Sequence, residues 1–399
     1  MPSSCTSKDT WPREVRKRGI MPANFSLYDL FADLVVYRDL NPVDARLPRF
    51  EAASVEIGLS GATRPRKHEP AYALTMAWFL QRARYLEMPG TAIKELIYLG
   101  DTVLSDSNAF RNLRSAGGWQ GWAFIGAEKD EALAIAEQDD IYTANRWTAL
   151  APFTAWALEQ GAVLDARTAV IIDIDKTALG ARGRNDGAID RARVTAIEAT
   201  VAEALGPAFD PASFRRAYGE LNQARYHPFT ADNQDYLAYT CLMLGAGVST
   251  LEDLQADIAA GRLAAAQDLM AQVDAQRDRL PSRVLRELHD DIYSRVKAGD
   301  PTPFKAFRRR EYLETTAKMG NLPDNVPLAR RLLEEICLTQ EVIEVGQWFS
   351  SRGCLVMALS DKPDEATMPS PEAAAQGHLP LHRTATHVVG QSIAHLLPS

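Results

Sequence analysis

The fold of this chain is decided by one run of residues, Ala169-Val170-Ile171-Ile172-Asp173-Ile174-Asp175-Lys176-Thr177. The run is apolar and ends abruptly at two carboxylates, which is typical of a buried parallel strand that delivers acidic side chains to the edge of an α/β sheet. Two like charges this close are costly unless a cation neutralises them or one carboxyl holds a proton. The run therefore predicts a chemical site at Asp173 and Asp175. The plainer alternative is a strand end that caps a helix or makes a turn.

Other apolar runs predict the remaining elements of the sheet and its helices. Strands are expected at 54–59, 95–101, 121–126 and 352–360, and helices at 27–36, 71–85, 108–113, 128–138, 144–160 and 384–397. Strand, polar loop, helix and strand follow one another, which indicates βαβ crossovers and a parallel sheet. From residue 189 to about residue 346 the pattern changes to long Ala- and Leu-rich stretches at helical period. We therefore expect a helical domain inserted into an α/β one.

Composition places the chain among ordinary globular proteins. Of its 399 residues 46% are hydrophobic and 24% charged, and the net charge of 44 − 52 = −8 argues against nucleic acid or an anionic membrane as partner.

No apolar run approaches the ~20 residues that span a bilayer. Residues 1–20 lack the apolar segment of a secretory signal, so a disordered tail is expected there. The widely spaced Cys5, Cys241, Cys337 and Cys354 fit reduced thiols and a cytoplasmic location. An oligomer is compatible with the sequence, but nothing indicates one.

Polar side chains follow three of the predicted strands. They are Asp173 and Asp175, Ser360, and Asp101 with Asp106. A phosphoryl-transfer site needs a carboxylate nucleophile, a proton shuttle, a hydroxyl for the phosphate oxygens and a further carboxylate for a metal, because positioning and charge neutralisation supply most of the catalysis. Lys67, just before the helix expected at 71–85, is the candidate for a cation near the phosphate. The plainer alternative for Lys67 is a solvated lysine at a helix start.

These segments resemble the motifs of the haloacid dehalogenase-like phosphohydrolases. Residues 173–177 resemble the first motif of that family, 355–360 its second, 100–106 its fourth, and 50–70 its third strand with the helix that bears its lysine. Here the order is third, fourth, first, second, so the chain looks circularly permuted, which is tolerated where the termini lie close together at the surface. The resemblance covers roughly residues 50–127, 168–186 and 353–362, which belong to the core and not to the insert.

The resemblance implies a role for each matched residue. Asp173 would attack phosphorus, and Asp175 would act first as general acid and then as general base. The phosphate-binding residues would be Ser360, Lys67 and Thr177, with Lys362 as a competitor of Lys67. Mg2+ would bind the Asp173 carboxylate, the backbone carbonyl of Asp175, and Asp101 or Asp106. From composition alone, Lys362 in Ser360-Asp361-Lys362-Pro363 is more typical of an exposed turn.

The resemblance also defines the expected fold class and domains. The fold is α/β, with a Rossmann-like parallel sheet core flanked by helices and a large α-helical cap inserted after the first motif. The expected divisions are a tail at 1–20, a first core part at 21–188, a cap at 189–346 and a second core part at 347–399. In this family a cap between the first and second motifs closes over the site and excludes water.

Two stretches of the insert are candidates for substrate binding. Residues 226–236 concentrate hydrogen-bonding side chains, and residues 301–312 supply basic groups that suit an anion. The candidates are Asp232, Asn233, Lys305 and Arg308, with Arg184 and Asn185 just past the first motif, and more weakly His382 and Arg383. The alternatives are a loop with helix-capping residues for the first stretch and a solvated amphipathic helix for the second, and each outweighs binding.

The expected function is that of a Mg2+-dependent phosphatase that hydrolyses a small phosphorylated metabolite through an aspartyl-phosphate. Two alternatives remain at this point. A phosphotransferase would need the cap to exclude water from the aspartyl-phosphate. A non-catalytic binding protein that keeps the fold is disfavoured by the pair Asp173 and Asp175, because a scaffold has no need of two apposed carboxylates.

Overall fold

The computed structural model describes residues 25–59, 64–129 and 131–399. The tail expected at residues 1–20 lies outside them. Within these residues the chain forms a seven-stranded sheet in the order β1-β8-β6-β2-β3-β5-β4. The strands, in that order, are Val35–Val36, Leu355–Leu359, Thr168–Asp173, Glu95–Gly100, Gln120–Gly126, Ile141–Ala144 and Ile135–Gln138. All neighbours pair in parallel except β4 with β5. The predicted α/β fold with a mostly parallel sheet is therefore confirmed.

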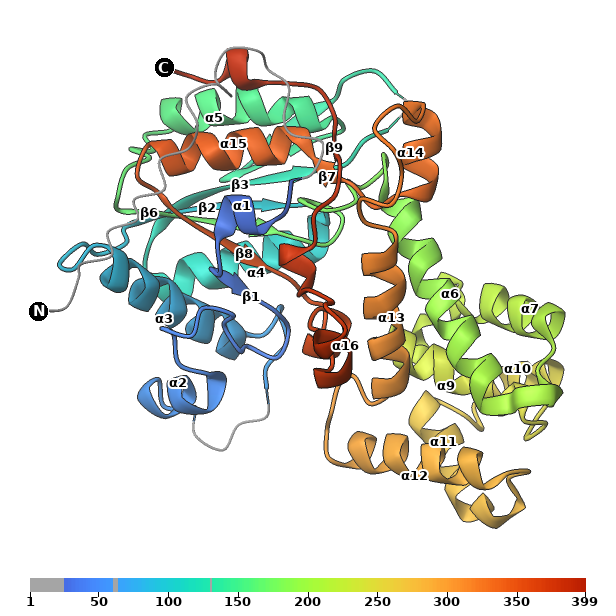
Figure 1. The fold of residues 1–399 in the computed structure, drawn as a ribbon. Helices are drawn as coiled ribbons and strands as arrows, with labels where there is room; N and C mark the ends of the chain where they lie inside the picture. The colour runs from blue at the N-terminus through green and yellow to red at the C-terminus, as the bar shows by residue number, and fades with distance from the viewer. Residues whose placement is uncertain (1–24, 60–63, 130) are drawn as a thin grey trace, which may run out of the picture.

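Helices cover both faces of the sheet (Figure 1). On one face lie α2 (Phe50–Glu56), α3 (Pro70–Glu87) and α4 (Val103–Gly117), and on the other α1 (Tyr28–Phe31), α5 (Leu150–Glu159) and α15 (Gln340–Ser351). Successive side chains of a strand point to opposite faces. In β2, Leu96 and Tyr98 accordingly join the α3–α4 side, whereas Ile97 and Leu99 join the α5–α15 side. Because both faces are buried, the central strands are continuous apolar runs.

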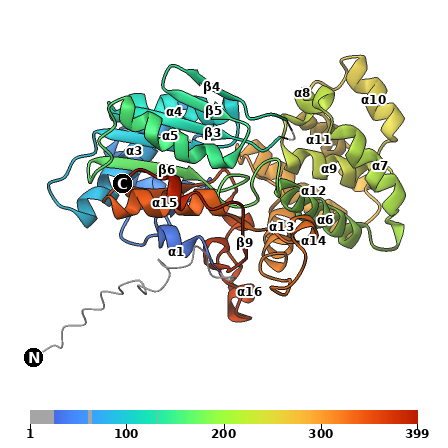
Figure 2. The same cartoon turned by 90° about the horizontal axis from the view of Figure 1, so that it is seen from above.

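The helical insert forms its own apolar core beside the sheet (Figure 2). It contains α6 (Asp186–Leu205), α7 (Pro211–Leu221), α8 (His227–Thr230), α9 (Gln234–Gly245), α10 (Leu251–Ala259), α11 (Ala266–Ala275), α12 (Arg283–Lys297), α13 (Lys305–Ala317) and α14 (Leu328–Glu334). Side-chain caps fix several helix starts: Asn233 accepts the Asp235 N–H at 3.0 Å, and Ser282 accepts that of Leu285 at 3.1 Å. The first turns of α6 pack with the sheet and its later turns pack in the insert, so α6 connects the two cores.

Several local predictions were wrong. Of the strand expected at 54–59, residues 54–56 are the end of α2 and residues 57–58 form the turn that follows it. Where a helix is expected at 128–138, the chain forms β4, which pairs with β5 in a hairpin. Asp139, with φ 54°, occupies the left-handed region that such a tight turn requires. The helix expected at 144–160 is shorter, because β5 ends at Ala144 and α5 begins at Leu150.

The predictions at the two ends of the chain need similar correction. The segment expected as a helix at 27–36 divides into α1 and the short strand β1, and α4 is longer than the predicted 108–113. Instead of a helix at 384–397, the chain forms β9 (Val388–Val389), which pairs with β7 (Leu338–Thr339), and a short 3-10 turn at Ala394–Leu396. None of the helices in the described part of the chain is both long and apolar enough for a membrane span.

Candidate active site

Three adjacent strands deliver the predicted motifs to one edge of the sheet. β6 lies between β8 and β2, with Asp173 opposite Leu359 and Ile172 opposite Leu99. The residues that follow these strands therefore lie side by side: Ser360 after β8, the loop to Asp175 after β6, and Asp101 after β2. The structure brings together carboxylates that are more than 70 residues apart in the sequence.

Lys67 lies in the centre of the carboxylates. Its Nζ is buried and donates hydrogen bonds to Asp106 Oδ1 and to Asp173 Oδ1, both at 2.7 Å. Asp106 also accepts from the Tyr98 hydroxyl at 3.0 Å and from the backbone N–H groups of Asp101 and Thr102 at 3.0 and 2.8 Å. Four donors thus occupy both oxygens of Asp106, so its role is to hold Lys67 and the loop after β2.

Asp173 and Asp101 keep more capacity for a cation. No described residue hydrogen-bonds to the second oxygen of the Asp173 carboxylate, and none donates to the backbone carbonyl of Asp175. Asp101 is paired with Arg182, which lies beyond the first motif. These three groups are the oxygen donors that could hold Mg2+, since hard cations prefer carboxylate and carbonyl oxygens.

Burial sets the electrostatics of these carboxyl groups. It raises the pKa of Asp173 well above the usual range, and Asp106 and Asp101 add to that rise against the opposing charge of Lys67. Burial, with the charge of Asp106, likewise raises the pKa of Asp101 to about 6 despite Arg182. One lysine and one arginine therefore do not fully neutralise this cluster, and a further cation would favour its ionised form.

Asp175 lies at the junction of core and insert. Its carboxylate oxygens are 3.5 Å from Arg193 on α6 and 3.6 Å from Lys362 Nζ, and its side chain is 23% exposed. Lys362 is buried and also lies 3.4 Å from Glu311 of α13, so its interpretation as an exposed turn lysine was wrong. Lys67 contacts Asp173 directly, whereas Lys362 faces Asp175.

The two predicted phosphate-binding hydroxyls are less accessible. Ser360 is fully buried, and its Oγ accepts the Lys362 backbone N–H at 3.1 Å. Thr177 is also fully buried, and its carbonyl accepts from the Thr339 hydroxyl at 2.5 Å. Neither lines the cavity described next.

A cavity of about 370 Å³ opens at this edge of the sheet, between the core and the insert. We call it the sheet-edge cavity. Its cationic lining residues are Arg38, Arg66, Lys67, Lys176, Arg182, Arg193, Arg308 and Lys362, and its acidic ones are Asp101, Asp106, Asp173, Asp175, Asp232 and Asp361. Eight cations and six carboxylates line the cavity, and four of these cations also pair with Glu311, Asp235 or Asp190 outside the lining. This concentration of cationic side chains suits an anion.

Three predicted substrate residues line the cavity and three do not. Asp232, Asn233 and Arg308 line it. The others have structural partners: Arg184 pairs with Glu128 and Glu341, Asn185 donates to the carbonyls of Leu332 and Glu335, and Lys305 pairs with Asp300 and Glu365. These three predicted substrate-binding residues therefore lie outside the lining of the cavity. His382 is buried against Asp33 and Tyr37, and Arg383 also pairs with Asp33.

Several residues of the site have no signal in the sequence. Arg38, Arg193 and Glu311 lie outside the segments that resemble the family, and Arg66 and Arg182 lie within those segments but match none of the motif residues. Glu311 is fully buried and accepts from Arg193 and Arg308 at 2.9 and 2.6 Å. The one sequence feature that points to this part of α13 is the basic stretch 301–312, to which Glu311 belongs.

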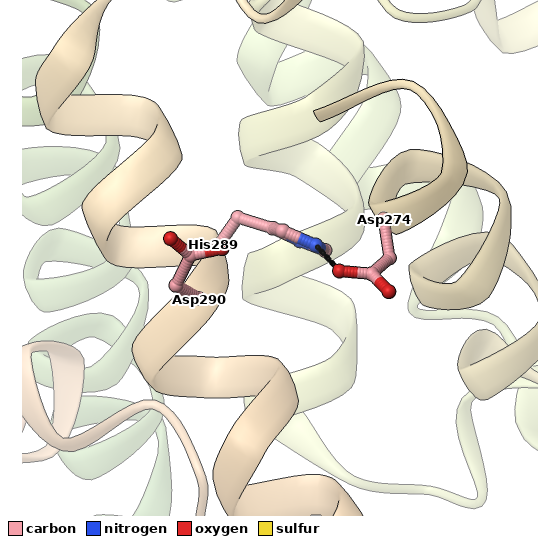
Figure 3. A group of neighbouring side chains, drawn as sticks. All are labelled: Asp274, His289 and Asp290. Atoms are coloured by element: carbon pink, nitrogen blue, oxygen red, sulfur yellow. Dashed lines mark ion pairs between the residues drawn. The ribbon is translucent and has the colours of Figure 1, made fainter. Parts of the chain in front are cut away.

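A second acidic cluster lies in the insert, where Asp274, His289 and Asp290 approach one another (Figure 3). Each has a protein partner. His289 Nε2 lies 3.5 Å from Asp274, its Nδ1 lies 2.7 Å from the Tyr239 hydroxyl, and Asp290 is paired with Arg277. Burial lowers the pKa of His289. The cluster therefore serves packing between α11 and α12.

In comparisons with family models, with curated proteins and with solved structures, nothing matches this chain.

Proposed function

We propose that this chain is a Mg2+-dependent phosphatase that acts on a small phosphorylated metabolite. The observation that carries the proposal is the buried Asp173 carboxylate, 2.7 Å from Lys67, at the floor of a cationic cavity. Asp175 stands at the same edge, and its Oδ1 is buried without a hydrogen-bond partner among the described residues. A nucleophile, a separate proton carrier and phosphate-binding cations are what covalent phosphoryl transfer requires.

The reaction has two displacements at phosphorus. In the first, an Asp173 oxygen forms a bond to phosphorus as the bond to the leaving oxygen breaks, and Asp175 gives that oxygen its proton. In the second, Asp175 takes a proton from water, the water oxygen bonds to phosphorus, and the bond to Asp173 breaks to release inorganic phosphate. Lys67 and Lys362 hold the phosphoryl oxygens.

Asp173, Asp101 and the Asp175 carbonyl would hold Mg2+, with Arg182 released from Asp101. The bound ion supplies charge neutralisation for the phosphoryl group. We further infer a cytoplasmic location, because the three cysteines in the described part of the chain are buried and unpaired.

The test is hydrolysis of a panel of phosphate esters, including 4-nitrophenyl phosphate, with Mg2+ and with EDTA. We expect Mg2+-dependent release of phosphate, lowered by about 10⁴-fold or more in Asp173→Asn, because the covalent nucleophile is lost. The matched control is Asp165→Asn, which changes a partly exposed aspartate near the other end of β6. Equal turnover by Asp173→Asn and wild type, or equal turnover with EDTA, contradicts the proposal.

A further inference from the structure

Two arginines of the sheet-edge cavity differ from its other cations. Each of the other six has a carboxylate within ion-pair distance: Lys67, Lys176, Arg182, Arg193, Arg308 and Lys362. For Arg38 and Arg66, no described residue forms a side-chain hydrogen bond or ion pair with the guanidinium group. Both nevertheless line the cavity, and Arg66 is only half-buried.

Arg38 loses contact with water without gaining an ion-pair partner among the described residues. Burial lowers the pKa of Arg38, and the like charges of Arg308 and Arg66 lower it further. Asp361, whose charge has the largest effect of the four, and Asp235 oppose this, but neither forms an ion pair with the guanidinium group, and Asp361 is itself exposed. Holding two guanidinium groups near each other without an ion-paired carboxylate costs free energy, which a bound anion would return.

Both arginines are attached to the proposed phosphate-binding elements. Arg38 follows β1, and its backbone N–H donates to the Lys362 carbonyl at 3.1 Å. Arg66 directly precedes Lys67 in the chain. The two guanidinium groups therefore belong to the same cavity as the lysines that would hold the transferred phosphoryl group, but they are not held by the carboxylates of that site.

We infer that Arg38 and Arg66 bind a second anionic group of the substrate, so that the substrate is a small phosphate ester carrying a further phosphate or carboxylate. The inference rests on the proposed phosphatase function. Arginine suits both anions because its planar group offers paired N–H donors that match two oxygens. A cavity of about 370 Å³ has the size of a small-molecule site.

The test compares three propyl phosphates that differ only at the far carbon, which ends in methyl, carboxylate or phosphate. For the wild type we expect kcat/KM to be about tenfold to a hundredfold higher for at least one of the two-anion esters than for the methyl ester, as expected for hydrogen bonds between charged groups. Whether carboxylate or phosphate is preferred identifies the second anion. Equal kcat/KM for all three esters overturns the inference.

The variants are Arg38→Gln and Arg66→Gln, with Arg64→Gln as the matched control. Arg64 lies in the same loop as Arg66, pairs with Glu51 and does not line the cavity. We expect each test variant to lose most of the preference for the two-anion ester while kcat/KM for the methyl ester changes less than about threefold. If the methyl ester loses as much, the arginines act on the transferred phosphoryl group and the inference is wrong. Because Arg66 is half-buried, its variant remains informative should Arg38→Gln fail to fold.

A binding measurement separates this inference from the phosphatase proposal. Propylphosphonate and propane-1,3-bisphosphonate cannot be hydrolysed, and their dissociation constants can be measured by calorimetry with the full chain and Mg2+. We expect the bisphosphonate to bind at least about tenfold more tightly, with the difference lost in Arg66→Gln. If no ester is hydrolysed but this difference is found, the phosphatase proposal fails and the anion site stands. Equal affinity for the two phosphonates rejects the anion site whatever the activity.

Discussion

Replacing Glu311 with glutamine tests the ion-pair network that joins the helical insert to the core. Glu311 is fully buried on α13 and contacts Arg193 and Arg308 of the insert and Lys362 of the core. Burial alone would raise the pKa of this carboxyl, but the charges of Lys362, Arg308 and Arg193 together hold it well below its usual range. The carboxylate is therefore ionised in the folded protein, and glutamine keeps its shape while removing its charge.

The expected cost follows from what the three cations retain. Removing one partner of a buried ion pair costs about 3 to 5 kcal/mol. Each cation keeps a second carboxylate: Asp175 for Arg193 and Lys362, and Asp235 for Arg308. We therefore expect a loss near the lower limit, about 3 kcal/mol in the free energy of unfolding at pH 7.

The same carboxyl sets a pH dependence. Its pKa is lower in the folded protein than the value of about 4.3 for an unperturbed glutamate. Its stabilisation is therefore fully present above that pH and is lost as the pH falls toward the folded-state pKa. The difference in the free energy of unfolding between wild type and Glu311→Gln should therefore become smaller as the pH is lowered below 5.

Urea unfolding followed by two probes measures this effect. All seven tryptophans lie outside residues 186–334, and the six in the described part of the chain belong to the core, so fluorescence does not report the insert, whereas far-UV circular dichroism does. We expect the dichroism transition of Glu311→Gln to move to lower urea more than the fluorescence transition does. Glu314→Gln, on the same helix but without an ion-pair partner among the described residues, is the control. A loss below about 1 kcal/mol, matching the control, would refute the reasoning.

Two further substitutions test the core. Asp106→Asn should lower the free energy of unfolding by about 3 kcal/mol, because each carboxylate oxygen accepts from two donors and the amide NH2 that replaces one oxygen cannot accept from either. An unchanged thermal unfolding midpoint contradicts this. Asp364→Asn should raise stability at pH 8 by about 2 kcal/mol and change little at pH 4. Burial, with the nearby charge of Asp39, raises the pKa of Asp364 to about 6. Ionisation of this carboxyl therefore lowers the stability of the folded protein as the pH rises through that value. Urea midpoints across this range check the sign, and a gain independent of pH would show that charge is not the cause.

The central strands could be predicted because burial on both faces leaves a continuous apolar run. This holds for β2, β3, β6 and β8, each of which is buried over all or nearly all of its length. The edge strands escaped prediction for the opposite reason. β1 has two residues, and β4 is exposed throughout, so neither carries the alternation or the apolar run that marks a strand. Their pairing depends on the neighbouring strand and, for β4, on the turn at Asp139.

The same distinction explains which site residues could be predicted. Asp173 is the last residue of a buried strand, and Asp101 and Ser360 directly follow buried strands, so the local pattern already places them at the sheet edge. Lys362 follows the same strand, yet its turn-like surroundings predict exposure, because the sequence around it does not show that Glu311 of α13 covers it. A lysine is buried only where a carboxylate compensates its charge, and that carboxylate lies 51 residues away in the chain. The position of three cavity cations, Arg193, Arg308 and Lys362, thus depends on how the insert packs on the core. Variants that loosen this packing without changing the sheet, such as Glu311→Gln, should therefore weaken anion binding in the cavity. The four buried strands should remain intact in these variants.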